Sequence, residues 1–496
     1  MYLLGFDIGS SSIKAALVDS SSGETIAVAQ YPEIEMDIIS RQSGWAEQQP
    51  EVWWESICQV SRKLLKITNI DSADIKAIGI AYQMHGLVVV DKDYQVLRPS
   101  IIWCDSRAVE IGNQAFDEIG NERCLKHLLN SPGNFTASKL KWVKDNEPEL
   151  YDRIHKIMLP GDYIAMKLTN EILTTETGLS EGILYDFLQN DVSDIVLDHF
   201  SFSRNLIPDV RPAFSEQGML SKKAAEETGL KAGIPVTFRA GDQPNNAMSL
   251  NVLEPGEIAA TGGTSGVVYG VVDRPAYDHL SRVNSFVHVN HTGENPRIGV
   301  LLCINGAGIQ YSWIKQQIAR DGTSYQDMER MVNTVPVGSD GLRIIPFGNG
   351  SERMLNNKNL GSHICNLHFN RHSRAHFYRA ALEGVAFSFV YGIGILKELG
   401  LNLGAIRVGN DNLFQSQVFS TTICNLLGNQ IEVIDTTGAV GAAKASGVAI
   451  GLFNSLNEAM STARVEKVYV PTNLNGVFSH AYQVWSSDLN KLLKKD

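Results

Sequence analysis

A turn of small residues near the N-terminus could hold a phosphate group. It consists of Gly9, Ser10, Ser11 and Ser12. Apolar runs lie on either side of it, at residues 2–8 and 13–19. Small residues let backbone N–H groups approach an anion closely, and they can form an anion-binding concavity. Asp7 precedes the turn, and its carboxylate could hold Mg²⁺ through water, because Mg²⁺ keeps several waters and takes few protein ligands. The alternative is an ordinary turn in which Asp and Gly are favourable.

A second carboxylate, Asp242, follows Gly241 after the run Val236–Ala240. Such a run is typical of a buried strand, and ligands bind at strand ends in α/β sheets. A carboxylate there could accept a proton from a sugar hydroxyl as that hydroxyl attacks a γ-phosphate. The alternative is a structural role, in which Asp242 caps a helix that begins near Asn245.

A second small-residue turn lies in the other half of the chain. It contains Gly263, Thr264 and Ser265, and apolar runs flank it. Its hydroxyl and N–H groups could hold the other side of a polyphosphate. The sequence has no G-x-x-x-x-G-K-[ST] and no G-x-G-x-x-G after its first strand, so a P-loop and a Rossmann dinucleotide site are both disfavoured.

Two further segments carry side chains suited to a sugar pocket. Met84 and His85 lie between two apolar runs, although a His there is more often a hydrogen-bonded structural residue. Trp103, Asp105 and Arg107 combine an aromatic face with a carboxylate and a guanidinium. Asp105 and Arg107 could equally form a local ion pair.

These residues need strands and helices to position them. The runs around Gly9 to Ser12 predict a β-hairpin, and residues 25–31 predict a third strand. The apolar spacing of Pro50–Lys66 predicts a helix, and two buried strands are predicted at Ile75–Ala81 and Leu87–Asp91. Strands that alternate with helices indicate an α/β fold. A similar order of strand, small-residue turn and strand returns around Gly263, which indicates two lobes.

Composition limits the classes of protein that fit. A chain of 496 residues exceeds a single hydrophobic core, so two domains are expected, divided near Pro244 to Pro255. The net charge of -11 argues against a nucleic-acid partner. The six cysteines form no C-x-x-C pair, a pattern that suits a reducing cytoplasm. Asp7 interrupts the first apolar run, which argues against a targeting segment there. The later apolar stretch Gly384–Leu396 is shorter than the ~20 residues of a membrane span. We therefore expect a soluble, cytoplasmic protein with no membrane partner, and a homodimer is a common default for such enzymes.

In order along the chain, these and other segments resemble the FGGY family of carbohydrate kinases. The resemblance covers nearly the whole chain, and no single string is decisive. It rests on F-D-I-G-S-S-S-I-K from Phe6, G-W-A-E-Q-Q-P-E-V-W-W-E at 44–55, T-A-S-K-L-K-W-V-K-D-N-E-P at 136–148, L-P-G-D-Y-I at 159–164, G-G-T-S at 262–265, R-A-A-L-E-G-V-A-F at 379–387 and G-A-V-G-A-A at 438–443, which is similar to a family helix start.

The resemblance implies an α/β fold of two actin-like, ribonuclease-H-like lobes with a central cleft. It implies an N-terminal lobe of residues 1–245 on the sugar side and a C-terminal lobe of residues 246–496 on the nucleotide side. It also implies transfer of the γ-phosphoryl group of ATP to a sugar, with Mg²⁺. Within the family, Q-M-H-G at 83–86 resembles the members that act on D-xylulose, which they phosphorylate at the C5 hydroxyl.

The resemblance assigns a role to each candidate residue. Asp242 is implied as the general base, and Asp7 as the residue that positions Mg²⁺. The implied sugar contacts are Met84, His85, Gln243, Trp103 and Asp105. The implied ATP contacts are Gly9, Ser10, Ser11, Ser12, Lys14, Gly263, Thr264, Ser265, Gly306, Gly409 and Asn410.

The sequence departs from the family at a glycine-rich turn near the adenosine site. The matching region is Val408 to Leu413, where only Gly409 remains and Asp411 is a carboxylate near a nucleotide. The segment Gly350 to Met354 also matches the family only in part. Three alternatives stay open: a kinase of the same fold for another ketose, polyol or sugar acid; a catalytically weak sugar-binding or regulatory protein; and an actin-like or chaperone-like ATPase, which the sugar-site segments disfavour.

Overall fold

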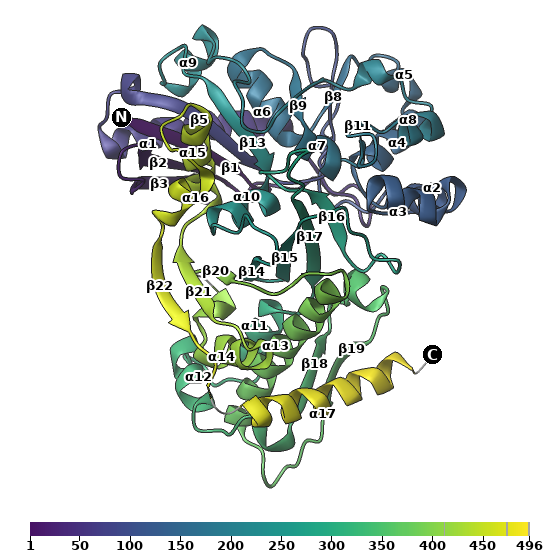
Figure 1. Ribbon diagram of the computed structural model, residues 1–496, viewed down its shortest axis with the longest axis vertical. Helices are drawn as coiled ribbons and strands as arrows, with labels where there is room; N and C mark the ends of the chain where they lie inside the picture. Colours follow the sequence, from purple (N-terminus) through teal and green to yellow (C-terminus); the bar gives the residue numbers. More distant parts are fainter. Residues whose placement is uncertain (411, 473–474, 495–496) are drawn as a thin grey trace. The chain divides into compact units, whose positions relative to one another are not determined.

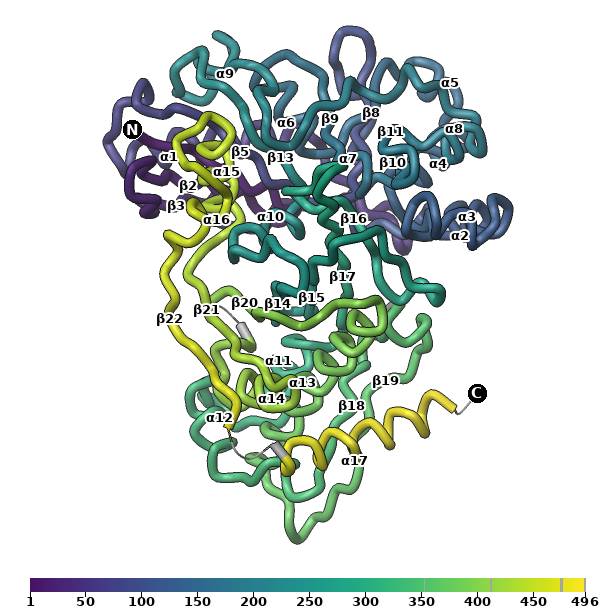
Figure 2. Tube along the Cα trace, viewed as in Figure 1, coloured from purple at the N-terminus to yellow at the C-terminus, as the bar shows by residue number. Residues whose placement is uncertain are grey.

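The computed structural model describes residues 1–410, 412–472 and 475–494, and it divides into two compact units. The first unit comprises Met1–Leu253, Ser285–Ile298 and Thr436–Ala463. The second comprises Glu254–Asn284, Gly299–Asp435 and Arg464–Asp496. The chain therefore returns to the first unit twice, as the tube in Figure 2 shows.

The first unit is built on a five-stranded sheet in the order β13-β5-β1-β2-β3. The predicted hairpin and the predicted third strand are confirmed, since β1 and β2 pair antiparallel and β2 also pairs with β3. The strands are β1 (Tyr2–Ile8), β2 (Ile13–Asp19), β3 (Thr25–Tyr31), β5 (Ile75–Tyr82) and β13 (Val236–Gly241).

Three of these strands are parallel and end at the same level. Asp7 of β1 and Ala240 of β13 both stand opposite Ala81 of β5. One residue later, Tyr82 stands opposite both Ile8 and Gly241. The residues that follow the three strands therefore emerge side by side at the carboxyl edge of the sheet.

Helices cover both faces of this sheet (Figure 1). Because strand side chains alternate between faces, Leu4 and Phe6 pack with the predicted helix, α1 (Pro50–Thr68), and with α6 (Pro160–Thr169). On the other face, Leu3 packs with α10 (Asp242–Ser249) and α15 (Gly438–Ala449). The start of α15 at Gly438 agrees with the predicted helix start.

Helix α15 lies so close to the sheet that its neighbours on two strands must be glycines. A Cβ atom on Gly5 would lie 2.0 Å from the Ala439 carbonyl oxygen, and one on Gly79 would lie 1.9 Å from that of Ala442. This packing places residues 436–463 in the first unit, although the resemblance assigned everything after residue 245 to the other lobe. A division at residue 245 therefore does not separate the compact units.

The rest of the first unit consists of short helices and two-stranded ribbons. The helices are α2 (Val109–Ile119), α3 (Asn121–Leu128), α4 (Thr136–Asn146), α5 (Pro148–Tyr151), α7 (Glu176–Glu181), α8 (Asp194–Phe200), α9 (Lys222–Thr228) and α16 (Leu456–Ser461). The ribbons pair β4 (Glu47–Gln48) with β7 (Ser100–Ile101), β6 (Val88–Val90) with β8 (Lys156–Met158), β9 (Leu173–Thr175) with β12 (Asp209–Arg211), and β10 (Tyr185–Asp186) with β11 (Asp191–Val192).

The second unit repeats the strand order of the first. Its strands follow the order β17-β15-β14-β20-β21-β22, and β14 again forms a hairpin with its successor and a parallel pair with β20. Five strands of each unit are thus arranged as third, second, first, fourth and fifth. The strands are β14 (Ile258–Gly262), β15 (Gly266–Val272), β17 (Ile298–Ile304), β20 (Ile406–Gly409), β21 (Ile431–Asp435) and β22 (Arg464–Tyr469), and β16 (Asn284–Val287) begins where the chain passes between units.

The core of the second unit contains the long helix α13 (Arg374–Glu398). It is long and apolar enough to cross a bilayer, but 83% of its most apolar stretch is buried inside the fold, as expected of a core helix. The other elements are α11 (Gly308–Gln317), α12 (Tyr325–Val332), α14 (Gln417–Leu427), α17 (Asn475–Leu493), β18 (Arg343–Phe347) and β19 (Gly361–Cys365).

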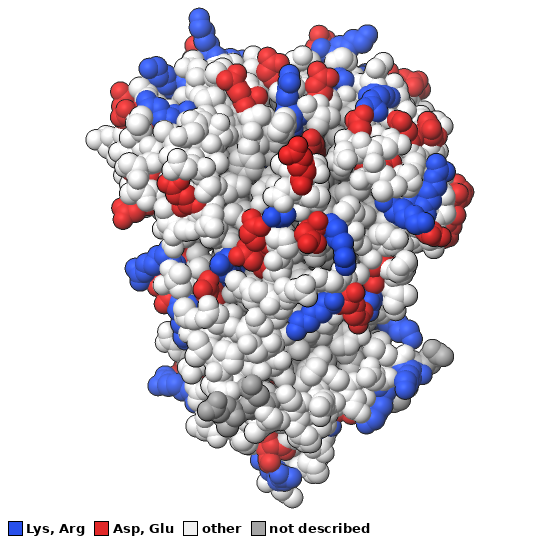
Figure 3. Space-filling model, in the orientation of Figure 1, with Lys and Arg blue, Asp and Glu red and all other residues white. Residues whose placement is uncertain are grey.

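Charged side chains are dispersed over the face shown in Figure 3. Basic and acidic groups alternate there, and neither sign forms a large continuous patch on that face.

We predict that Gly79→Ala lowers the free energy of unfolding by at least about 2 kcal/mol, because a methyl group would overlap backbone atoms of α15 that cannot move cheaply. Gly293→Ala is the matched control in the same unit, since nothing lies within 4 Å of a Cβ atom there. Urea unfolding of both variants would measure the difference. Equal stability of the two variants would contradict the proposed close approach of helix and sheet.

Candidate functional site

The carboxyl edge of the first unit's sheet brings together the candidates of the N-terminal half. Gly9, Gln83 and Asp242 are the residues that follow β1, β5 and β13. Asp7 stands one residue before the end of β1, and Met84 and His85 follow Gln83. The register of the sheet therefore places the predicted phosphate turn, the predicted sugar residues and the predicted base at one edge.

Asp242 lies half-buried at the start of α10. The helix begins at Asp242 itself and its N-cap residue is Gly241, so Asp242 is not the cap of a helix that starts near Asn245. Burial, and then the neighbouring Asp7 carboxylate, raise the pKa of Asp242 to about 7. A carboxyl group with such a pKa can both take up and release a proton near neutral pH.

Asp7 faces a small recess at the start of α15. A Cβ atom on Gly438 would lie 2.6 Å from Oδ2 of Asp7 and 2.8 Å from Oδ1 of Asn246. Two oxygen atoms thus face a space that glycine leaves open. Burial raises the pKa of Asp7, and the nearby Lys14 ammonium partly opposes this. No cluster of three or more His, Cys, Asp or Glu that could hold a metal ion occurs among the described residues.

The turn at Gly9 to Ser12 is closed by a hydrogen bond from the Gly9 N–H to the Ser12 carbonyl oxygen, at 3.1 Å. The Gln48 side-chain amide donates to the Ser10 carbonyl oxygen at 2.7 Å. The Trp103 indole N–H donates to the Ser10 hydroxyl at 3.3 Å. Trp103 is therefore beside the phosphate turn, where 53% of its surface is exposed, and Lys14 is exposed.

His85 and Met84 are held in defined positions after β5, and Met84 adjoins Gly241. His85 has φ of 62°, a backbone conformation that few side chains adopt, and its Nδ1 lies 2.8 Å from the Glu181 carbonyl oxygen. Its ring packs against Phe135 with centroids 4.7 Å apart. Met84 is buried, and its Cγ atom would lie 2.6 Å from a Cβ atom on Gly241. Gln243, on the first turn of α10, is half-buried.

Asp105 lies in the core of the first unit rather than on a pocket wall. Its side chain is fully buried, accepts hydrogen bonds from Ala46 N–H at 2.5 Å and pairs with Arg107 at 2.7 Å. Arg107 also pairs with Glu47 and stacks on the Trp45 ring at 3.8 Å. The ion pair that the sequence left as an alternative is therefore present, and it is buried.

The sequence analysis missed a buried carboxyl group beside the candidate base. Glu181, at the end of α7, is 1% exposed, and its Oε2 would lie 2.5 Å from a Cβ atom on Gly241. Burial raises the pKa of Glu181 well above its usual range, and Asp242 adds to this. In the sequence, Glu181 appears only as the second glutamate of E-T-G-L-S-E at residues 176–181. That segment does not show which of its two glutamates is buried.

In the second unit, the turn after β14 is tied to α11. Gly308 N–H donates to the Gly263 carbonyl oxygen at 2.9 Å, and Ile309 N–H donates to that of Thr264 at 3.1 Å. The Ser265 hydroxyl donates to Asn305 at 3.5 Å. The turn therefore has a fixed position at the beginning of a helix.

This turn lines a cavity of about 700 Å³. The stacked rings of Tyr311 and Tyr325, 5.7 Å apart, form part of its wall, and Glu329 lies among its lining residues. The lining also includes Leu413, the last residue of the predicted nucleotide segment, and Gln415 and Ser416, which follow it. The structure thus places two predicted nucleotide segments, distant in sequence, around one cavity.

Two further predicted nucleotide residues, Gly306 and Gly409, are not among the described residues that line this cavity. Gly306 has φ of 86°, and a Cβ atom there would lie 1.8 Å from the Pro346 carbonyl oxygen, so the position requires glycine. Gly409 ends β20, and Asn410 N–H donates to the Ile434 carbonyl oxygen at 3.2 Å. Asp411 lies outside the described residues. Gln310 has a buried side-chain amide with no hydrogen-bond partner among the described residues, and it lines a different pocket together with Gly306.

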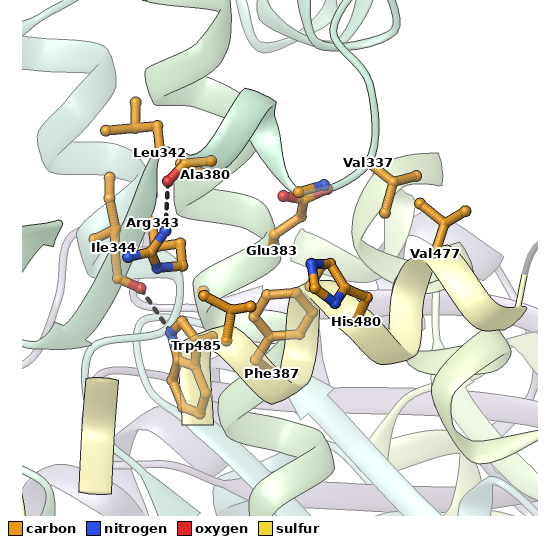
Figure 4. Close-up of a pocket in the computed structure, with 15 residues that line it drawn as sticks. Val337, Leu342, Arg343, Ile344, Ala380, Glu383, Phe387, Val477, His480 and Trp485 are labelled. Atoms are coloured by element: carbon orange, nitrogen blue, oxygen red, sulfur yellow. Dashed lines mark hydrogen bonds between the residues drawn. The ribbon is translucent and has the colours of Figure 1, made fainter. Parts of the chain in front are cut away.

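A different pocket lies beneath α17 in the second unit (Figure 4). Arg343 donates to the Gly341 carbonyl oxygen, Trp485 donates to that of Ile344, and Glu383 accepts from Ser339. The polar groups of these lining residues are thus engaged with the protein. None of the predicted site residues is among the described residues that line this pocket, so it is not the candidate site.

Comparison with known proteins identifies the family. Residues 2–249 match the N-terminal domain of the FGGY family of carbohydrate kinases, and residues 258–450 match its C-terminal domain. The xylulose kinase of Bacillus subtilis (strain 168) is 28% identical over 471 residues, which cover 92% of this chain and 90% of that protein.

The solved xylulose kinase of Rhodospirillum rubrum is similar with a TM-score of 0.89 at 23% identity, covering 99% of both chains. The solved gluconate kinase of Lactobacillus acidophilus is similar with a TM-score of 0.88 at 20% identity, covering 100% of this chain and 98% of that one. The similarity to these structures confirms the predicted fold class of two actin-like, ribonuclease-H-like lobes.

We predict that Asp105→Ala lowers the free energy of unfolding by about 3 kcal/mol, because the buried Arg107 guanidinium loses one of its two carboxylate partners and the Ala46 N–H loses its acceptor. Trp103→Ala should change it by less than about 0.5 kcal/mol, because that side chain is mostly exposed. Denaturant unfolding of the two variants measures both values. A stability of Asp105→Ala equal to that of the unmodified chain would show that the buried network is not structural.

Proposed function

The chain belongs to the FGGY family of carbohydrate kinases, and on this premise we propose that it transfers the γ-phosphoryl group of ATP to the C5 hydroxyl of D-xylulose. The proposal for the sugar is supported by the relative from Bacillus subtilis, which is a xylulose kinase, and by Q-M-H-G at residues 83–86. The observation that carries the reaction is Asp242, a half-buried carboxyl group with a pKa of about 7 at the carboxyl edge of the sheet.

Asp242 acts as the general base in this proposal. Its carboxylate accepts the proton of the attacking hydroxyl while the oxygen of that hydroxyl forms a bond to the γ-phosphorus. The bond from the γ-phosphorus to the bridging oxygen of ATP breaks in the same step, and ADP leaves. The raised pKa makes the carboxylate a stronger base than an exposed Asp, and Gly241 before it leaves the backbone close to Met84 and Glu181. Phosphoryl transfer depends mainly on positioning and charge stabilisation, so no covalent intermediate with the protein is needed.

Two turns supply the phosphate contacts. The backbone N–H groups and hydroxyls of Gly9 to Ser12 would hold one side of the polyphosphate, and Lys14 on β2 adds an exposed ammonium group. Gly263, Thr264 and Ser265 would supply the corresponding contacts of the second unit. Both turns join antiparallel strands, and small residues keep their N–H groups accessible.

Asp7 fits a magnesium ion that is held largely through water. Its Oδ2 and the Asn246 Oδ1 face the recess at Gly438, where a side chain would fill the space. Bound there, Mg²⁺ would offset the negative charge of the transferring phosphoryl group. The nearby Lys14 ammonium group lowers the pKa of Asp7 and so favours the ionised carboxylate that would hold the ion.

The nucleoside would occupy the cavity of the second unit. The Tyr311 and Tyr325 rings, which line it, offer aromatic surface for a base. Gly306, Gly409 and Asn410 would bring the backbone close to the nucleotide.

The sugar would contact Met84, His85 and Gln243, with the Trp103 ring at the edge of the phosphate turn. Asp105 is proposed to act indirectly, because its buried carboxylate is used by Arg107 and Ala46. It would fix the segment that carries Trp103.

A kinase of the same fold for a different polyol or sugar acid is the second candidate. The similarity to a gluconate kinase at a TM-score of 0.88 favours it, because one fold serves acceptors that differ in charge. A single hydroxyl or carboxylate on the acceptor can decide such specificity. A binding protein without turnover is disfavoured by the raised pKa of Asp242, which suits a proton acceptor.

ADP release with MgATP over a panel of ketoses, polyols and sugar acids tests the proposal. We expect the highest kcat/KM on D-xylulose, and we expect Asp242→Ala to lower it by at least about a thousandfold while the variant stays folded. Asp209→Ala, which removes an exposed carboxylate on β12, is the matched control and should retain activity. Highest activity on a sugar acid or polyol would select the second candidate, and near-normal turnover of Asp242→Ala would remove Asp242 as the base.

We also predict that Asp7→Asn raises the Mg²⁺ concentration needed for half-maximal rate by about tenfold or more, because an amide oxygen lacks the charge of a carboxylate. A titration of the sugar-dependent rate with Mg²⁺ at fixed ATP measures this. The dependence of Asp209→Ala should match that of the unmodified chain. An unchanged Mg²⁺ requirement in Asp7→Asn would exclude Asp7 from the metal site.

A further inference from the structure

One face of helix α4 contacts both segments that carry the proposed sugar residues. We call these segments the 83–86 loop, with Met84 and His85, and the 102–107 loop, with Trp103 and Asp105. Thr136, Lys139 and Trp142 follow one another at intervals of three residues, so they lie on the same side of the helix. The contacts of these three side chains join α4 to both loops.

Lys139 makes the central contact of this face. Its ammonium group donates to the His85 carbonyl oxygen at 2.7 Å and to the Ile102 carbonyl oxygen at 3.0 Å. One side chain is therefore bonded to the backbone of both loops at once. The residues that adjoin the two loops also meet, since Leu87 N–H donates to the Ile101 carbonyl oxygen at 3.0 Å.

The neighbouring positions of α4 bind one loop each. The Thr136 hydroxyl donates to the Gly86 carbonyl oxygen at 3.3 Å. The Trp142 ring packs edge-on against Trp45 at 5.2 Å, and the Arg107 guanidinium lies 4.7 Å from its centroid. Lys139 thus stands between a contact to the 83–86 loop and a contact to the 102–107 loop.

The backbone of His85 needs such support, because its φ of 62° is in the left-handed region. Lys139 holds the carbonyl group of this residue, and the Glu181 carbonyl oxygen holds Nδ1 of its ring. Both ends of the residue are fixed by the interior of the first unit. The ring can therefore present one orientation to a ligand.

Burial of a lysine for packing alone would be unfavourable. Lys139 is fully buried, and burial lowers its pKa to about 7, although the Asp105 carboxylate partly opposes this. An apolar side chain of the same length would fill the space without this desolvation. Only the two carbonyl contacts make use of its N–H groups among the hydrogen bonds of the described residues.

We propose that Lys139 is a positioning residue of the sugar site, which holds the 83–86 and 102–107 loops in one mutual arrangement. The proposal rests on the proposed function, in that His85 and Trp103 are taken to contact the sugar. Lys139 itself does not reach the reacting atoms. Its effect should appear in sugar recognition and in the mobility of the loops, and not in nucleotide binding.

Lys139→Met tests the proposal, because it keeps the length of the side chain and removes its N–H donors. Lys141→Met is the matched control, since Lys141 lies on the same helix, is partly exposed and pairs with Asp145. Amide hydrogen exchange is measured without ligand over residues 83–87 and 102–106. The KM values for sugar and for ATP are then measured separately.

We expect Lys139→Met to speed amide exchange in both loops by about tenfold or more, and to raise the sugar KM by about tenfold to a hundredfold with the ATP KM unchanged. Lys141→Met should alter none of these values. Faster exchange in only one loop, unchanged exchange, or equal changes in both KM values would overturn the proposal. If Lys139→Met does not fold, Lys139→Gln is measured instead. Its side chain keeps N–H donors but is too short to reach both carbonyl oxygens, so the same rise in sugar KM with an unchanged ATP KM is expected.

These outcomes separate the two proposals. A wild-type chain without sugar-dependent ADP release contradicts the proposed function, whatever the loops do. A wild-type chain with turnover and a Lys139→Met variant with unaltered sugar KM contradicts only the positioning role. If amide exchange in Lys139→Met is faster in both loops but the unmodified chain shows no turnover, Lys139 still holds the two loops together. The proposal that this contact serves sugar binding is then rejected.

Discussion

The parallel pairing of β1, β5 and β13 sets the position of almost every candidate group in the first unit. Because Ala81 stands opposite both Asp7 and Ala240, the three strands end together and release the phosphate turn, the 83–86 loop and Asp242 at one edge. A shift of one residue in any pair would turn side chains to the other face. The close approach of α15 supports this register, since Gly5 and Gly79 leave room for its backbone.

Buried charge is concentrated beneath this edge. Asp105 and Arg107 form a pair inside the first unit, Lys139 is bonded to two carbonyl groups, and Glu181 lies beside Gly241. Replacing such groups with apolar ones often stabilises a protein, so their presence is poorly explained by stability alone. Each of them contacts or adjoins a loop with a proposed ligand contact. Rigid loops let the binding of a sugar proceed without a large loss of conformational freedom.

The two units use one strand order for different purposes. Each begins with a hairpin whose turn is made of small residues, and each adds further strands in the same sequence. In the first unit the carboxyl edge that holds the turn also holds Asp7 and Asp242, two carboxyl groups that suit metal and proton chemistry. In the second it borders a cavity with aromatic walls, which suits a nucleoside. The same backbone therefore supplies two turns that we propose to bind phosphate, and the side chains around each turn differ.

The sequence by itself determined the local elements and the types of chemistry. Apolar alternation around Gly9 to Ser12 and at Val236–Ala240 marked the strands correctly, because hydrophobic periodicity is a local property. The ordered motifs gave the family. Sequence could not show that Asp105 is buried in an ion pair, that residues 436–463 return to the first unit, or that Glu181 adjoins Asp242. Those facts depend on contacts between residues far apart along the chain, and only the tertiary structure decides which polar side chains face a ligand and which hold the fold.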